Sequence, residues 1–195
     1  MADLPNVEKN RFVVEGATGT DMVVNPCGAI GAFDFEGHIR EAKKLYYISE
    51  NFNLASSGTQ APAFLIRNPN GSGKIIRLTG LEALLTNTVG AIAIVRLYHG
   101  PTITANGTAL TIRNASHGGS PGATAMNAYS GPTISANGNR ICGGTILSGT
   151  SGGRDLLLPF KGNIAIHPNN DLLITGQPDG TNRAMELTLR WSEDV

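Results

Sequence analysis

The chain has 195 residues, of which 41% are hydrophobic and only 15% charged, whereas a typical soluble domain is about one quarter charged. Its 15 basic and 15 acidic side chains cancel to a formal net charge of zero, so no overall field favours a nucleic acid or an anionic membrane as partner. The longest strongly apolar run, Ala91–Val95, is far shorter than the ~20 residues that a membrane helix needs.

The start of the chain and its cysteines indicate where the protein is made. Residues Met1–Pro5 lack the basic and apolar regions of a secretory signal, so we expect assembly in a cytoplasm. Cys27 and Cys142 lie far apart, and each precedes a glycine, which matches neither a disulfide framework nor a metal-ligand pair. We expect both thiols to be reduced and partly buried.

Residues 1–44 differ from the rest and are predicted to form an extended N-terminal arm. Within the arm, Glu36–Lys44 favours a short helix because Ile39, Ala42 and Leu45 have near-helical spacing, but a solvated turn fits equally well. The arm's apolar residues are too scattered to form a core and costly to leave in water, so we expect them to contact another protein surface. They are Phe12, Val13, Val14, Met22, Val23, Val24, Ile30, Phe33 and Phe35.

From residue 45 to residue 195 the sequence alternates short apolar runs with turn residues, which predicts one all-β domain, a β-sandwich similar to a jelly roll. The clearest run is Ala184–Trp191, whose alternate residues are apolar. Leu81–Leu85 stays unassigned, because its composition prefers helix whereas the preceding residues prefer strand. The expected strands are Leu45–Ser49, Ala63–Arg67, Lys74–Thr79, Ala91–Tyr98, Ala109–Arg113, Ile141–Leu147, Ile164–His167, Leu172–Thr175 and Ala184–Trp191.

An eight-residue segment occurs twice. Gly100–Gly107 reads Gly-Pro-Thr-Ile-Thr-Ala-Asn-Gly, and Gly131–Gly138 repeats it with a single Thr-to-Ser difference. A tyrosine lies shortly before each copy, the proline starts an extended piece, and Asn-Gly favours the positive φ angles of a tight turn. We therefore expect two equivalent strand-turn units within one sandwich, with facing sheets as one arrangement.

One motif resembles part of a phosphate-binding loop but lacks the required context. Asn70–Lys74 ends in Gly-x-Gly-Lys, yet Asn68 stands where the first glycine belongs and Ile75 where a hydroxyl for magnesium is required. A plain hairpin loop is the better interpretation.

Other residues that could carry chemistry also lack their partners. Gly118–Gly122 and Gly149–Gly153 match the nucleophile elbow of serine hydrolases, but neither has the strand before it and the helix after it that the elbow needs. The four histidines have no metal-ligand spacing. Asp34 and Glu36 could pair as in glycosidases, but no carboxylate occurs between Gly100 and Arg154 to build a cleft there. We therefore predict a protein that is not an enzyme, with no catalytic residue, metal or cofactor. The histidines are His38, His99, His117 and His167.

The chain resembles small virion proteins of tailed bacteriophages over about residues 41–193. The resemblance is carried by the Asn-Pro-rich segment Asn68–Lys74, the strand end Val95–Tyr98, the two copies of the repeat and the closing Leu189–Glu193. It implies a β-sandwich or jelly roll that assembles as a homotrimer on capsids, and similar folds occur in tail-tip and fibre proteins.

Together these observations predict a virion structural protein that decorates or cements the head by binding the major capsid protein, with no nucleic-acid or membrane partner. All of the apolar arm residues except Ile30 are then the candidates for the capsid or protomer interface. A tail, baseplate or receptor-binding module is the alternative, and a cellular carbohydrate-binding sandwich is a third reading that the few aromatic residues disfavour.

Overall fold

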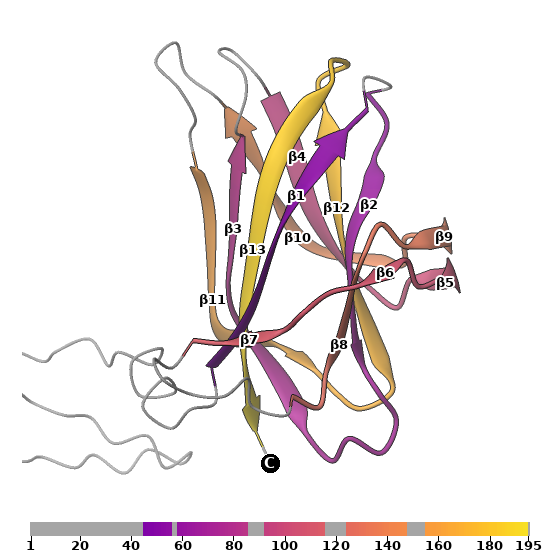
Figure 1. Ribbon diagram of the computed structural model, residues 1–195, viewed down its shortest axis with the longest axis vertical. Helices are drawn as coiled ribbons and strands as arrows, with labels where there is room; N and C mark the ends of the chain where they lie inside the picture. Colours follow the sequence, from indigo (N-terminus) through magenta and orange to yellow (C-terminus); the bar gives the residue numbers. More distant parts are fainter. Residues whose placement is uncertain (1–44, 56–57, 86–91, 116–123, 148–154, 195) are drawn as a thin grey trace, which may run out of the picture. The chain divides into compact units, whose positions relative to one another are not determined.

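The computed structural model describes residues 45–55, 58–85, 92–115, 124–147 and 155–194, and within these ranges the chain is all-β (Figure 1). This confirms the predicted fold class. No helix in the described residues is long and apolar enough to cross a membrane. The expected N-terminal arm, its short helix and its eight interface candidates lie outside the described residues. The strands are β1 (Leu45–Leu54), β2 (Ala61–Asn68), β3 (Ile75–Leu85), β4 (Ile92–His99), β5 (Thr102–Ala105), β6 (Thr108–Ala109), β7 (Arg113–Asn114), β8 (Asn127–Ser130), β9 (Thr133–Ala136), β10 (Asn139–Leu147), β11 (Asp155–Ile166), β12 (Asn170–Pro178) and β13 (Arg183–Asp194).

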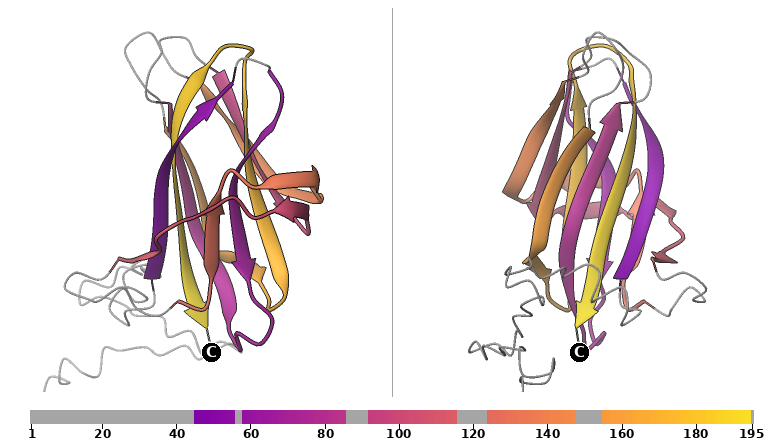
Figure 2. Two further views of the ribbon diagram at one scale, coloured as in Figure 1. Left: turned by 45° about the vertical axis from the view of Figure 1, so that its right-hand side comes forward. Right: turned by 90° about the vertical axis from the view of Figure 1, so that its left-hand side faces the viewer.

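Two antiparallel sheets face each other and form the sandwich (Figures 1 and 2). The five-stranded sheet has the order β11-β3-β13-β1-β7, and the six-stranded sheet has the order β10-β4-β12-β2-β8-β6. A third sheet contains only β5 and β9 and lies on the outer side of the six-stranded sheet, at the right of Figure 1. Both strands of this small sheet come from the repeated segment.

The core lies between the two large sheets and follows the alternation of the sequence. On β13, Met185, Leu187, Leu189 and Trp191 are all fully buried, as the apolar alternation predicts. The Trp191 ring stacks on the ring of Tyr46 from the neighbouring strand, with 6.1 Å between ring centroids. These residues pack against apolar side chains of the six-stranded sheet in one hydrophobic cluster.

The unassigned stretch Leu81–Leu85 is the second half of β3, a central strand between β11 and β13. Leu81 and Leu85 are buried in the core with Ala83 between them, while Glu82 points outward and binds Arg190 with 3.0 Å between Oε2 and Nη2. Pairing on both sides and burial of alternate residues therefore outweigh the helical preference of this sequence.

Two connections run between the sheets where the sequence predicted simpler elements. Residues 69–74 link β2 of the six-stranded sheet to β3 of the five-stranded sheet, so the predicted hairpin is wrong. The predicted strand Ala109–Arg113 is strand only at its ends, because Ala109 pairs with β8 while Arg113 pairs with β1. The chain crosses from one sheet to the other between these residues, and such a crossing cannot continue either ladder.

Candidate interaction site

The two copies of the repeat pair with each other. β5 and β9 are antiparallel, with Ile103 opposite Ile134 at the centre and Thr102 opposite Ala136 at one end. Near the other end, the Thr104 hydroxyl donates a hydrogen bond to the Thr133 carbonyl at 3.1 Å. We call the sheet of residues 102–105 and 133–136 the repeat ribbon. The predicted equivalence of the two copies is confirmed, whereas the placement on facing sheets is wrong.

The glycine at the end of each copy lies against the backbone at the start of the other copy. Gly107 has a φ of 87°, and a Cβ atom there would lie 2.2 Å from the Ser130 carbonyl oxygen, just before the second copy. Gly138 has a φ of 84°, and its Cβ would lie 2.4 Å from the His99 carbonyl oxygen, just before the first copy. Backbone cannot yield as a flexible side chain does, so both positions require glycine. The end of each copy packs on the beginning of the other.

Two leucines are buried on the outer face of the six-stranded sheet, the face from which the repeat ribbon projects. Leu172 and Ile174 belong to the core, so Leu173 between them points to the opposite face, and Leu65 points outward by the same alternation. Both outward leucines are nevertheless fully buried. The ribbon projects from that side of the sheet (Figure 2).

One end of the ribbon is held by an ion pair. Arg67 donates two hydrogen bonds to the Asp171 carboxylate, Nε to Oδ1 and Nη2 to Oδ2, both at 2.9 Å. Its Nη1 donates to the side-chain oxygen of Asn106 in the first copy at 3.0 Å. The hydrogen bond to Asp171 is the main cause that raises the pKa of Arg67. The Arg67 guanidinium therefore fixes the side chain of Asn106 at the end of the first copy.

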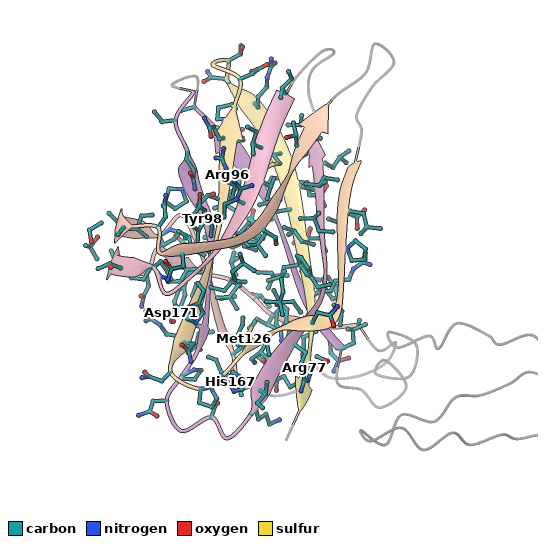
Figure 3. The ribbon with its side chains drawn as sticks, turned by 180° about the vertical axis from the view of Figure 1, so that it is seen from behind. Arg77, Arg96, Tyr98, Met126, His167 and Asp171 are labelled. Carbon is teal, nitrogen blue, oxygen red and sulfur yellow. The ribbon has the colours of Figure 1, made fainter. Side chains whose placement is uncertain are left out.

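Polar side chains form a second cluster further along the same outer face, labelled at Arg96 and Tyr98 in Figure 3. Arg96 Nη1 donates to Gln177 Oε1 at 2.5 Å, and the Tyr98 hydroxyl donates to Gln60 Oε1 at 3.1 Å. Gln60 in turn donates to the Thr175 hydroxyl at 2.7 Å. These side chains form hydrogen bonds with one another, so the cluster is a preformed polar surface. It contains no acid or base positioned for proton transfer.

The motifs that resembled chemical sites have other roles or lie outside the described residues. Lys74 binds the buried carboxylate of Glu193, with 3.3 Å between Nζ and Oε2, which the sequence could not show across 119 positions. The two elbow serines, Ser120 and Ser151, lie outside the described residues. Among the residues that are described, no three His, Cys, Asp or Glu side chains gather to hold a metal ion.

Some of the remaining candidates lie on the sandwich. His99 is exposed, and its Nε2 lies 3.2 Å from the side-chain oxygen of Asn170. His167 is exposed as well. Cys142 is a free, half-buried thiol, as predicted, and burial raises its pKa. His38, His117, Cys27, Asp34 and Glu36 lie outside the described residues.

A hollow of about 400 Å³ lies between the crossing segment and β8. Leu110 and Ile112 line one side, and Met126 and Tyr129 line another. None of its lining residues carries a charge at neutral pH, so it offers a small, uncharged recess rather than a site for acid-base chemistry.

The sequence matches no protein-family model and no curated protein. Among solved structures, the chain is weakly similar to one described as the structure of infectious bursal disease virus Gx strain, at 13% identity over 78% of this chain and with a TM-score of 0.17. A D431N mutant VP2 protein of the same virus, from T=1 particles, gives 13% identity over 76% of this chain and a TM-score of 0.19. The chain spans about 40% of the length of each. At these scores the superpositions do not establish a common fold.

Proposed function

We propose that the chain is a non-enzymatic structural protein of a virus particle, and more specifically that it decorates or cements the head of a tailed bacteriophage by binding the major capsid protein. It would be made in the host cytoplasm and become part of the virion. The observation that carries this proposal is the repeat ribbon, a projecting and uncharged element that is built to make contacts.

The ribbon suits protein contact because it is preorganised. The ladder between β5 and β9, the two obligatory glycines and the Arg67–Asp171 pair hold its backbone in place before any partner binds. A surface that is already ordered loses little conformational entropy on binding, so more of each contact contributes to affinity. Its exposed groups are hydroxyls and methyls of Thr, Ser and Ala, which fit a partner surface without charge.

The positions of the charged side chains also support a binding role. Ion pairs within the sandwich engage Arg67, Lys74 and Arg190. From Gly100 to Gly153 the only charged residues are Arg113 and Arg140. A contact surface of this kind depends on shape and on hydrogen bonds, so we expect its affinity to change little with salt.

The test uses heads that lack this protein, with tails and host cells as competing targets. We expect the full-length chain to saturate heads and to sediment with them at 50 mM and at 500 mM salt with similar affinity. Binding to tails or host cells in place of heads would contradict the decoration role and favour the tail or receptor-binding alternative. Binding to none of the three would contradict a virion role altogether.

A deletion tests whether the arm or the sandwich anchors the protein to the head. Removal of residues 2–35 takes away the eight interface candidates of the arm, and we expect the truncated protein to keep its thermal unfolding transition but to lose head binding. If the truncated protein still saturates heads, contact runs through the sandwich, and the repeat ribbon is its main candidate.

A further inference from the structure

The repeat ribbon has a local two-fold symmetry that extends into the sheet below it. The six-stranded sheet reads β10-β4-β12-β2-β8-β6, so a two-fold axis between β12 and β2 exchanges β4 with β8 and β10 with β6. The pairing agrees with this axis, because Tyr98 lies opposite Leu173 as Tyr129 lies opposite Leu65. Each tyrosine precedes one copy of the repeat.

The hydrogen bonds at the start of the two copies follow the same axis. The Gly100 amide donates to the Asp171 carbonyl on β12 at 3.1 Å, and the Gly131 amide donates to the Ala63 carbonyl on β2 at 2.9 Å. The two copies therefore leave the sheet in the same way. Their exposed residues form equivalent pairs, of which Thr102 with Thr133 is one.

Symmetric backbone geometry alone does not require identical residues. Just after the ribbon, β6 and the start of β10 occupy equivalent positions, yet one reads Thr108-Ala109 and the other Asn139-Arg140. Below the ribbon, the Arg67–Asp171 pair holds Asn106 in the first copy only. Many residue types can fill exposed strand positions at small cost. The near-identity is thus confined to Gly100–Gly107 and Gly131–Gly138, the two segments that contain the projecting strands.

We propose that the repeat ribbon is a two-fold seat, which binds two identical, uncharged protein segments, one on each strand, that a two-fold axis of the partner relates. This inference rests on the proposed function, since the partner is then a pair of neighbouring capsid subunits. Two identical half-sites account for the repeated Thr-Ile-Thr/Ser-Ala, because each strand meets the same surface. Both halves are held in one rigid ribbon, so the second contact forms at high effective concentration.

The test compares equivalent substitutions in the two copies. Thr102→Arg and Thr133→Arg each place a long charged side chain on one half-site, and both positions are exposed, so folding should be unaffected. Thr145→Arg is the matched control, because Thr145 is exposed on β10 and points to the same outer face, away from the ribbon. Thermal unfolding of all variants checks the fold, and sedimentation with heads that lack the protein measures binding.

We expect each ribbon variant to lose about tenfold in affinity, the double variant about a hundredfold, and the Thr145 control less than about twofold, since independent contacts add in free energy. A reconstruction of decorated heads should place the ribbon on a two-fold axis between capsid subunits. A large loss from one copy and none from the other would overturn the two-fold seat but leave head binding intact. Failure of the unaltered protein to bind heads would instead contradict the proposed function on which the seat rests.

Discussion

Glu193 is a buried carboxylate near the end of β13 that ties three parts of the chain together. Its side chain is 1% exposed, and it accepts hydrogen bonds from the Thr124 hydroxyl and from the Ala125 amide at 3.0 Å. Lys74 reaches it from the connection between the two sheets. Because Thr124 and Ala125 lead into β8, the carboxylate fixes the entry to that strand against β13.

Replacing Glu193 with Gln should therefore destabilise the sandwich. The change keeps the volume but removes the charge, so Lys74 loses its partner and the hydrogen bonds to the Thr124 and Ala125 donors weaken. We expect a loss of about 1–3 kcal/mol in the free energy of unfolding, measured from urea transitions at an unchanged m-value.

Glu82→Gln is the matched control, since Glu82 pairs with Arg190 on the outer face with both side chains about 40% exposed. An exposed pair contributes about 0–1 kcal/mol. Equal midpoints for the two variants would show that the Glu193 contacts do not stabilise the fold.

At the scale of elements, the two ribbon glycines should be equally intolerant of a side chain. Gly107→Ala and Gly138→Ala each add a β-carbon at a residue with positive φ, and that carbon lies against a carbonyl oxygen just before the other copy. We expect each to cost about 3 kcal/mol or more, or to unpair the ribbon locally, as seen in thermal unfolding and in hydrogen exchange of β5 and β9.

Gly71→Ala separates the two causes of that cost. Gly71 has a φ of 77°, but a Cβ there would meet nothing within 4 Å, so only backbone strain of about 1–2 kcal/mol remains. If the ribbon variants cost no more than this control, the close approach between the two copies does not constrain them.

Local alternation was enough to predict β13, because its four apolar residues all point into one core. The same alternation did not assign Leu81–Leu85. This stretch is a strand because β11 and β13 pair with it on both sides, and the five residues themselves do not reveal those partners. The repeat was visible in the sequence, but its self-pairing was not. The pairing of the two copies depends on how the strands before them are arranged in the sheet. That arrangement is set by strand pairs such as Leu65 with Leu173, whose residues lie far apart in the chain.

At the scale of the whole molecule, we predict a homotrimer, as the resemblance to virion proteins implies. Two large apolar side chains on edge strands are exposed: Ile141 on β10 is 42% exposed, and Leu157 on β11 is 58% exposed. Light scattering at micromolar concentration should give three times the chain mass, and Ile141→Ser with Leu157→Ser should shift the protein toward monomer. A monomer at every concentration, in solution and on particles, would contradict the trimer.

The reciprocal closure of the repeat ribbon also bears on how the protein folds. Gly107 rests on the residues that open the second copy, and Gly138 rests on those that open the first. Neither copy can reach its final place until the other has arrived, so the loop between them must close before either gains its contacts. The stretch from β4 to β10 should then form late and as one cooperative unit, and it should open as one, with the amides of both strands exchanging together.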